Sequence, residues 1–566
     1  MRREYKNVGK KNLPIGYDNF REVIEGGFYY VDKTLFIKTL LDRKGKANLF
    51  TRPRRFGKSL NLSMLRYFFE DTGDEETNKR NRSLFSGLKI MEEGEAYLSG
   101  MTGYPVISLT LKSAKQPDFH LAAVSIKRQI ANEYRRHEEI AAKLGSRKER
   151  FKKIMMEQGD EGDYIDSLAF LSQCLEAVYK KRCIILIDEY DVPLENAWFG
   201  GFYGEMSSLI RSLFESALKT NECLEFAVIT GCLRISRESI FTGLNSLEIS
   251  SVLDVDYGEY FGFLQMEVDE MLEYYGLGAK GELIREWYDG YCFGKSEIYN
   301  PWSVAKYVKE LSSNEDGLPA PFWANTSSNS IVRTLVEQAD STVKEEIEDL
   351  IAGKGIEKPI HEDITYEDIF RSEDNLWNFL FFTGYLRLDS KRLEGDTRYI
   401  TMKIPNTEVR YIYKNTIREW FGIKVRQKDL SVLYQAIEQS DTDRMSRELS
   451  LNLQETISFY DYAESFYHGF LAGLLKNMKN YRILSNRESG DGRPDLILRT
   501  PSVRGRAIII GIKVVDKLPD LEAGCEIALH QIDKQYEAAL KAEGYETIMK
   551  YGISFYKKEC LVKAGI

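Results

Sequence analysis

The chain has 566 residues, of which 43% are hydrophobic and 29% are charged, and its formal net charge is −9. This length exceeds what a single hydrophobic core organises, and it predicts roughly three or four domains. The composition is typical of a globular protein. The negative net charge excludes a basic surface over the whole chain, so any surface for nucleic acid must be local.

Cysteine usage and apolar runs indicate the compartment. Seven cysteines occur without a Cys-x-x-Cys pair, which argues against a zinc module and against a disulfide framework. No run of about 18 apolar residues occurs, and no apolar stretch follows the initial Met-Arg-Arg-Glu-Tyr-Lys. We therefore expect a cytoplasmic protein without a membrane partner.

The first patterned segment runs from Leu13-Pro-Ile-Gly16 to Tyr30-Val-Asp-Lys-Thr34. We expect Asp32 to cap a helix over residues 35–41, since its carboxylate can accept from free N–H groups one turn further on. Two interpretations stay open for this segment. It lines the base side of a bound nucleotide, or it is a packed entry strand and helix.

A phosphate-binding loop is predicted after a short apolar run at residues 47–50. The loop ends in Gly-Lys-Ser, and a helical pattern follows it as far as Phe69, which is the context of a P-loop. Free N–H groups and the helix dipole favour an anion there. We expect Lys58 to reach the β- and γ-phosphates of ATP and Ser59 to ligate Mg²⁺. The expected ATP-binding residues are Arg52, Pro53, Arg54, Arg55, Phe56, Gly57, Lys58, Ser59 and Leu60.

The loop departs from the usual P-loop at its start. Arg52 stands where the common motif has glycine, and Pro53 follows it. Considered alone, the stretch also fits a basic turn that caps a helix, so a second element is needed to support a nucleotide site.

That second element follows a continuous apolar run at residues 183–187, typical of a buried parallel strand. Asp188 and Glu189 come directly after it, at the end of a strand where α/β sheets bind ligands. This is a Walker B pattern. We expect Asp188 to hold Mg²⁺ and Glu189 to polarise the attacking water.

A further apolar strand at residues 224–229 ends in Thr230. A polar residue at this strand tip is where P-loop ATPases place a sensor of the γ-phosphate. Arg234 and Arg237 follow, and either is a candidate arginine finger, acting within one chain or across a subunit boundary of a homo-oligomer. Each is also consistent with an ordinary surface arginine.

Five spaced motifs together resemble the bacterial AAA-ATPase-like family over about residues 10–265. In that family an Arg-Pro-Arg-Arg-Phe-Gly-Lys-Ser loop replaces the glycine-rich start, so Arg52 matches the family form. The resemblance implies an α/β P-loop NTPase domain with a parallel sheet. The motifs are Pro14-Ile-Gly16, Tyr30-Val-Asp-Lys-Thr34, Arg52-Pro-Arg-Arg-Phe-Gly-Lys-Ser59, Ile187-Asp-Glu-Tyr-Asp191 and Thr230-Gly231.

These observations divide the chain into four predicted parts. Residues 1–265 form the ATPase domain, and residues 266–355, with aromatic turns between amphipathic patterns, form a helical lid. Residues 356–430 form a connector, for which a winged-helix-like fold is one interpretation. Residues 431–566 form the last domain.

The last domain carries a second set of chemical residues. A helix with Glu464 precedes Pro494-Asp495 at the start of a strand, the next strand carries Lys513, and another helix follows. This layout resembles the PD-(D/E)XK nuclease superfamily, which implies a restriction-endonuclease-like α/β fold that binds DNA or RNA. The resemblance assigns Asp495 and Glu464 to a divalent metal and Lys513 to the nucleophile or the developing charge. Finer agreement lies in Tyr467-His-Gly469, Ser485-Asn-Arg-Glu488 and Gly492-Arg-Pro-Asp495.

One expected ligand is missing from this set. The second carboxylate of the superfamily stands two residues before Lys513, and here that residue is Gly511, which has no side-chain oxygen. Three explanations stay open: a degenerate nuclease retained for binding nucleic acid, a displaced carboxylate from Glu488 or Asp491, or a substitution in this isolate of a native Glu. Two oxygen ligands from the chain hold Mg²⁺ weakly.

The sequence therefore predicts an ATP-binding and ATP-hydrolysing protein. Its nucleotide state is expected to control a nuclease-like domain that binds nucleic acid and is impaired in cleavage. Two alternatives are a nucleotide-dependent scaffold that cleaves nothing, and an active nuclease that uses the displaced carboxylate.

Overall fold

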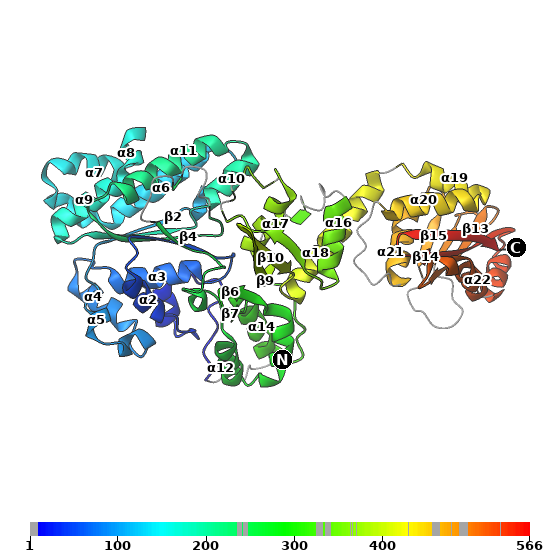
Figure 1. The fold of residues 1–566 in the computed structure, drawn as a ribbon, viewed down its shortest axis with the longest axis horizontal. Coiled ribbons are helices and arrows are strands. Elements are labelled where there is room, and N and C mark those ends of the chain that lie inside the picture. The colour runs from blue at the N-terminus through cyan, green and yellow to red at the C-terminus, as the bar shows by residue number, and fades with distance from the viewer. Residues whose placement is uncertain are drawn as a thin grey trace, which may run out of the picture. The chain divides into compact units, whose positions relative to one another are not determined.

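The structure is a computed structural model (Figure 1). It describes residues 9–234, 240–241, 247–323, 332–333, 341–362, 364, 366–369, 371–427, 429–454, 464–476, 478–485, 496–532 and 534–565. The chain divides into two compact units. The N-terminal unit comprises Met1–Ser328 and Gly355–Tyr411, and the C-terminal unit comprises Asn329–Lys354 and Ile412–Ile566.

A five-stranded parallel sheet lies at the centre of the N-terminal unit, in the order β2-β3-β4-β1-β5. All residues of β1 and β3 are buried, because helices cover both faces of the sheet. Strand β4 separates β1 from β3, so the tips of these three strands lie side by side. The strands are β1 (Ala47–Thr51), β2 (Val106–Thr110), β3 (Cys183–Asp188), β4 (Leu224–Gly231) and β5 (Leu247–Ser250). This confirms the predicted α/β class.

Two groups of helices form the outer layers (Figure 1). One face carries α2 (Leu35–Arg43), α3 (Lys58–Phe69), α4 (Glu75–Ser83) and α5 (Glu95–Leu98). The other carries α6 (Phe119–Arg136), α7 (Lys148–Met155), α8 (Glu161–Ile165), α9 (Ser167–Tyr179), α10 (Val192–Gly200) and α11 (Tyr203–Phe214). Helix α1 (Phe20–Glu25) packs on α3.

Helix α2 agrees with the sequence, but its expected cap is wrong. The Asp32 carboxylate makes no cap to α2. It accepts instead from the Thr34 N–H at 2.8 Å and the Thr34 hydroxyl at 2.6 Å, and its second oxygen accepts from Lys89 N–H at 2.7 Å. Asp32 therefore stabilises the turn before α2 and ties it to a later segment.

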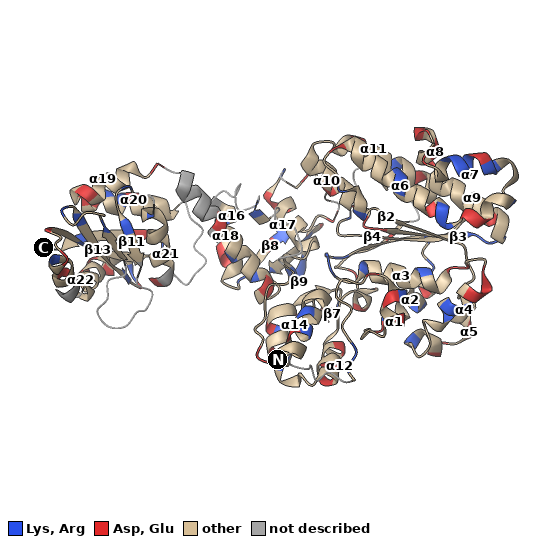
Figure 2. Cartoon of the chain, turned by 180° about the vertical axis from the view of Figure 1, so that it is seen from behind, with Lys and Arg blue, Asp and Glu red and all other residues tan. Residues whose placement is uncertain are grey.

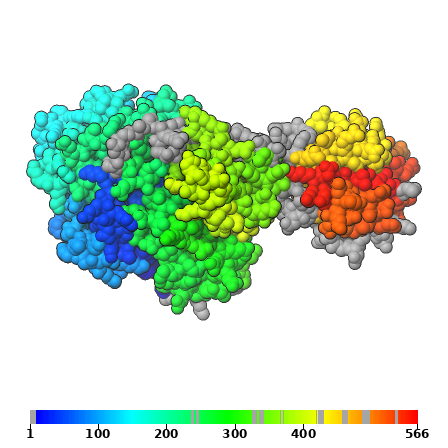
Figure 3. Space-filling view, in the orientation of Figure 1, coloured from blue at the N-terminus to red at the C-terminus, as the bar shows by residue number. Residues whose placement is uncertain are grey.

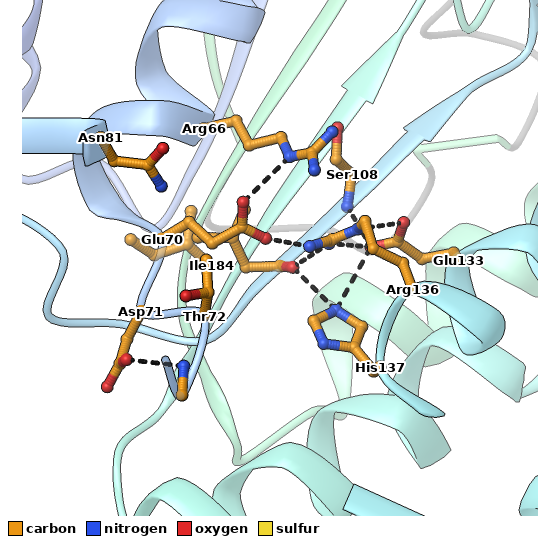
Figure 4. A network of polar contacts seen from close by, with 12 residues as sticks. Arg66, Glu70, Asp71, Thr72, Asn81, Ser108, Glu133, Arg136, His137 and Ile184 are labelled. Carbon is orange, nitrogen blue, oxygen red and sulfur yellow. Dashed lines mark hydrogen bonds and ion pairs between the residues drawn. The ribbon is translucent and has the colours of Figure 1, made fainter. Parts of the chain in front are cut away.

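A buried polar network joins α3 to α6 beside the edge strand β2 (Figure 4). Glu70, which ends α3, pairs with Arg66 at 3.1 Å and also with Arg136. Arg136 donates through Nε to Glu133 at 2.9 Å, and Glu133 accepts from Ser108 N–H at 2.7 Å. Burial raises the pKa of the Glu133 carboxyl to about 8. The network fixes the C-terminal end of α3, whose other end carries the predicted phosphate loop.

A helical layer with a small hairpin completes one side of the N-terminal unit. It contains α12 (Gln265–Tyr275), α13 (Gly281–Tyr288), β6 (Tyr291–Phe293), β7 (Ser296–Ile298) and α14 (Pro301–Ser313). Figure 3 shows the start of the chain, in dark blue, against these green elements. Lys10 Nζ donates to Tyr275 O at 2.7 Å, and Leu13 lies in the same apolar core as Val268.

A three-stranded antiparallel sheet also belongs to this unit, in the order β8-β10-β9. Its elements are β8 (Ile356–Pro359), β9 (Arg387–Glu394) and β10 (Thr397–Lys403), and α17 (Glu373–Phe382) packs against β8. The aromatic face of α17 explains this position, since Trp377 and Phe381 are both buried.

The C-terminal unit is built on a mixed five-stranded sheet, in the order β11-β12-β13-β14-β15. Only β13 and β14 pair in parallel, and α22 and α23 connect them. The strands are β11 (Arg482–Ser485), β12 (Leu496–Arg499), β13 (Arg506–Val514), β14 (Thr547–Tyr556) and β15 (Glu559–Gly565). The helices include α16 (Ser341–Ile351), most of α18 (Thr407–Gln427), α19 (Ser431–Gln439), α20 (Thr442–Gln454), α21 (Glu464–Leu475), α22 (Leu521–Gln531) and α23 (Lys534–Ala542).

Alternate side chains of β13 belong to two different clusters of the hydrophobic core of this unit. Ile508, Ile510 and Ile512 pack in one cluster with residues of α19, α20 and α21, whereas Ile509 belongs to a second cluster with Leu540. This is the period of two that a strand covered on both faces requires. Within the described residues of both units, no helix combines the length and apolarity needed to span a membrane.

Candidate functional site

The predicted phosphate loop joins β1 to α3 with an unusual backbone. Gly57 precedes the first residue of α3 and has a left-handed φ of 83°, and Arg55 has a φ of 70°. A side chain at Gly57 would be strained at this φ. No described side chain caps α3, so its first N–H groups are left for another acceptor. This is a backbone suited to an anion.

The Lys58 side chain is turned into the loop. Its Nζ donates to the backbone oxygens of Arg52 and Pro53, at 2.8 Å each, and the residue is only 6% exposed. Backbone carbonyl groups of the loop thus hold the Lys58 ammonium group inside the turn that would surround a phosphate.

Three polar side chains meet at the tips of α3, β3 and β4. Ser59 Oγ donates to Asp188 Oδ2 at 2.6 Å, and Thr230 Oγ1 donates to Asp188 Oδ1 at 2.5 Å. Both carboxylate oxygens are therefore oriented by hydroxyl groups from neighbouring elements. Hydroxyl and carboxylate oxygens are hard ligands of the kind that Mg²⁺ prefers.

Glu189 occupies the next position with a left-handed φ of 54°. Its N–H donates to Thr230 Oγ1 at 3.4 Å, so the strained residue is tied to the tip of β4. Burial raises the pKa of the Glu189 carboxyl, and the nearby Asp188 carboxylate raises it further. A carboxyl with a raised pKa is a better proton acceptor.

Asp191 ties the same turn to β4, although the sequence did not single it out for this role. It is 2% exposed, and its carboxylate accepts from Cys232 N–H at 2.6 Å and from Leu233 N–H at 3.2 Å. Burial raises the pKa of the Asp191 carboxyl.

A cavity of about 410 Å³ lies over the loop. Its lining includes the polar residues Lys58, Ser59 and Glu189 and the apolar residues Ile15 and Phe263. A phosphate-bearing ligand with a flat apolar group fits such a lining. Other lining residues include Leu13, Pro14, Asp18, Tyr29, Val31, Lys33, Arg54, Arg55, Phe56, Gly57, Leu60, Lys112, Lys115, Glu195, Met271, Trp302 and Ala305.

The first basic residue of the loop has a buried place. Arg52 is fully buried and donates to Thr51 O at 2.9 Å and to Ser250 O at 2.7 Å. Its guanidinium carbon lies 5.1 Å from the centre of the Phe261 ring. These contacts anchor the start of the loop to β5, and Gly384 lies so close that a Cβ built on it would be 2.8 Å from Pro53 Cβ.

The other arginines of the loop lie along the cavity. Arg54 forms an ion pair with Glu195 of α10, and the Arg55 guanidinium stacks 4.3 Å from the centre of the Trp302 ring. Burial lowers the pKa of Arg55. The aromatic side chain of Phe56 packs against Tyr291 of the hairpin.

Of the two candidate arginine fingers, the structure describes one and not the other. Arg234 pairs through Nη1 with Glu362 at 3.3 Å, and Arg237 lies outside the described residues. Lys112 and Lys115 line the cavity instead. Both lysines follow shortly after β2, and they reach the cavity because parallel strands end at the same edge of a sheet.

In the C-terminal unit, two predicted residues come together. Lys513 Nζ lies 3.9 Å from the Glu464 carboxylate of α21. Asp495 and both alternative carboxylates, Glu488 and Asp491, lie outside the described residues.

Gly511 is closed in by α22. A Cβ atom built on Gly511 would lie 2.4 Å from Ala528 O, and one built on its strand partner Gly552 would lie 2.3 Å from Cys525 O. These distances are too short for real atoms, and the obstructing atoms are backbone. The helix therefore occupies the space that a side chain at position 511 would need.

The two units fit divalent metals differently. Ser59 and Asp188 supply adjoining hard oxygens beside the loop, and the remaining ligands of Mg²⁺ at such sites come from phosphate and water. Across the part of both units that the structure describes, no group of three acidic, histidine or cysteine side chains is placed to hold a metal ion, and in the C-terminal unit Gly511 adds no ligand.

Comparisons with known proteins agree with the division of the chain into two different units. Residues 14–241 match a family model described as predicted AAA-ATPase, and residues 462–565 match the model of the PD-(D/E)XK nuclease superfamily. The chain therefore carries an N-terminal AAA-ATPase-like domain and a C-terminal domain of the PD-(D/E)XK nuclease superfamily, which confirms both predicted resemblances.

A relative extends the likeness over both domains. It is an uncharacterized protein in the vnfD 5' region of Azotobacter chroococcum mcd 1, 26% identical over 574 residues, and the match covers 97% of each chain.

Proposed function

We propose that the N-terminal unit binds and hydrolyses ATP with Mg²⁺. The observation that carries this proposal is the Asp188 carboxylate, which accepts hydrogen bonds from Thr230 at 2.5 Å and from Ser59 at 2.6 Å, and Ser59 lines the 410 Å³ cavity. Bound Mg²⁺ would neutralise charge on the β- and γ-phosphate oxygens. Ser59 and Asp188 are the residues that would hold it.

The remaining residues have separate tasks in this proposal. Lys58 exchanges its two backbone acceptors for phosphate oxygens, and the N–H groups at the start of α3 bind the same anion. Glu189 orients the attacking water and accepts its proton, which its raised pKa favours. Thr230 senses the terminal phosphate through Asp188 and the Glu189 N–H.

For the C-terminal unit we propose binding of DNA or RNA without efficient cleavage. Its superfamily supports a nucleic-acid ligand. The closed packing at Gly511 supports the loss of the second metal carboxylate. Lys513, beside Glu464, is then a cation for a phosphate of the nucleic acid rather than a group that positions a nucleophile.

We further propose that the nucleotide state of the first unit controls this binding. The support is the joint presence of an ATPase-like domain and a nuclease-superfamily domain in one chain, and the full-length likeness of the Azotobacter protein. Two competing functions make different predictions. A scaffold would bind no nucleic acid, and a nuclease with a displaced carboxylate would cut it.

The ATPase proposal is tested by phosphate release from the purified full chain. Lys58→Ala should lose nucleotide binding, whereas Glu189→Gln should retain ATP and release phosphate at least about 100-fold more slowly. Lys79→Met is a matched control, because Lys79 is exposed on α4 and does not line the cavity. Undiminished turnover in both site variants would contradict the assignment.

The second proposal is tested by titrating the full chain with fluorescent DNA and RNA, with ADP, with ATP, and without nucleotide. We expect binding whose affinity depends on the nucleotide, stimulation of ATP turnover by the bound nucleic acid, and no cleavage with Mg²⁺ or Mn²⁺. Cleavage would favour the displaced carboxylate, and absence of binding in every state would favour the scaffold.

A further inference from the structure

The cationic side chains that line the cavity over the phosphate loop differ in the contacts that hold them. Lys33 is buried and pairs with Glu267 at 2.6 Å, Arg54 pairs with Glu195, and Arg55 stacks on Trp302. These groups are held by packing within the unit. Lys112, in contrast, reaches the cavity from the exposed turn that follows β2.

The backbone places Lys112 next to the predicted metal carboxylate. Thr110, the last residue of β2, is the strand partner of Asp188, and Leu111 N–H donates to Asp188 O at 3.0 Å. Lys112 begins the short 3-10 turn that comes next. Its Cα is therefore tied to the strand end that presents Asp188 and Glu189, rather than to a separate surface loop.

The Lys112 ammonium is available for exchange. Its Nζ lies 3.5 Å from the Asp18 carboxylate, and the two side chains are 60% and 63% exposed. Exposed ion pairs of this kind contribute little to stability. The same ammonium lowers the pKa of Glu189 against the effect of burial, so its field reaches the carboxylate proposed to receive the water proton.

We infer that Lys112 is a further catalytic residue of the ATPase site, supplying a positive charge to the terminal phosphoryl group from within the same chain. This inference rests on the proposed ATPase function. In a nucleotide-bound chain, Lys112 leaves Asp18 for the more strongly charged phosphate. It thereby takes the role for which the sequence offered Arg234 and Arg237.

The chemistry that Lys112 assists is a balanced hydrolysis. A bond forms between the water oxygen and Pγ, and the bond between Pγ and the β–γ bridging oxygen breaks. The electron pair of the broken bond stays on ADP, and Glu189 accepts a proton of the water. Negative charge moves over the phosphoryl oxygens and the bridging oxygen, where an ammonium group placed beside them stabilises it most.

Single-site variants test the role. Lys112→Met keeps an unbranched side chain only one atom shorter and removes its charge, and we expect kcat to fall about 100-fold with little change in the Kd of ATP. Lys112→Arg should recover most of kcat. Lys79→Met should match the wild-type chain, since Lys79 is exposed on α4. An unchanged kcat in Lys112→Met would overturn the inference.

A mixing experiment tests whether the charge acts within one chain. Lys112→Met retains the water-activating Glu189, and Glu189→Gln retains Lys112. A mixture of the two should stay as inactive as its components if Lys112 serves its own site. Recovery of turnover in the mixture would show that the cation acts across subunits and would overturn the inference.

The outcomes separate this inference from the function on which it rests. No nucleotide-dependent phosphate release by the wild-type chain would contradict the ATPase proposal and the inference together. Turnover that Lys58→Ala abolishes and Lys112→Met leaves unchanged would preserve the ATPase proposal and refute only the role of Lys112.

Discussion

Glycine has opposite effects in the two units. At Gly57 a left-handed φ of 83° with open space around the missing Cβ turns the backbone over the cavity. At Gly511 the missing side chain lets α22 approach until Ala528 O would lie 2.4 Å from a Cβ. The first glycine leaves room for a ligand, whereas the second is used for packing between helix and sheet.

The predicted metal carboxylates of the two units also differ in their burial and in their hydrogen-bond partners. Asp188 is 9% exposed and is oriented by Ser59 and Thr230, which come from two other elements. Glu464 is more exposed and lies 3.9 Å from the Lys513 ammonium. The loss of a motif residue must therefore be judged together with the residues around it. Arg52 replaces a glycine and is accommodated by contacts with β5, whereas Gly511 replaces a ligand and its space is filled.

The largest expected effect tests the more complete of the two sites. Asp188→Asn keeps the size of the side chain but removes the charge that would balance Mg²⁺, so kcat for ATP should fall by about 100-fold or more. Phosphate release measured against Mg²⁺ concentration checks this. Asp316→Asn is the control, because Asp316 is exposed and lies away from the cavity. Equal turnover in both variants would remove the distinction between the two units.

Gly511 tests the closed site. Gly511→Ala should destabilise the C-terminal unit by about 1–3 kcal/mol, since the added methyl group meets helix backbone. Gly511→Glu should cost more and should not create cleavage. Hydrogen exchange of β13 and α22 in the full chain measures the loss.

Gly469→Ala is the matched control for this position. A Cβ there has nothing within 4 Å, and alanine favours the helix that contains it. A stable Gly511→Glu variant that cuts DNA or RNA would instead support a native glutamate at this position.

The pH dependence of turnover tests the environment of Glu189. Burial and the Asp188 charge raise the pKa of this carboxyl, and its deprotonated form is the one that accepts a proton. The rate should therefore be full above the raised pKa and should decline as the pH falls through it. We expect the acidic limb of kcat to lie above the ordinary value for a glutamic acid. A limb at that ordinary value would contradict the proposed role.

The smallest effect is expected on α7, where basic residues gather (Figure 2). The ammonium group of Lys153 is 2.9 Å from Asp163, and Arg150 pairs with Asp163 at 3.1 Å. The positive charges of Lys153 and Arg150 are therefore already paired with a carboxylate. Lys153→Ala should leave the free energy of unfolding almost unchanged and the affinity for nucleic acid unaltered. A marked loss of affinity would move the nucleic-acid surface into the N-terminal unit.

Local patterns predicted much of the fold. The apolar runs before Asp188 and Thr230 are β3 and β4, and the run around Leu49 is β1. The helical pattern that ends at Phe69 also predicted α3 (Lys58–Phe69). These elements follow from neighbours in the chain, because burial on both faces of a parallel sheet demands continuous apolar residues.

Tertiary structure decided which of these residues meet. Ser59 and Asp188 are 129 positions apart, and Thr230 is 42 positions beyond Asp188; only the order β3-β4-β1 brings them into contact. Lys112 reaches the cavity for the same reason. The residue types, and the strands that end in them, follow from local sequence alone. The sheet order and the close approach of α22 at Gly511 depend on packing between distant segments, which no local pattern encodes.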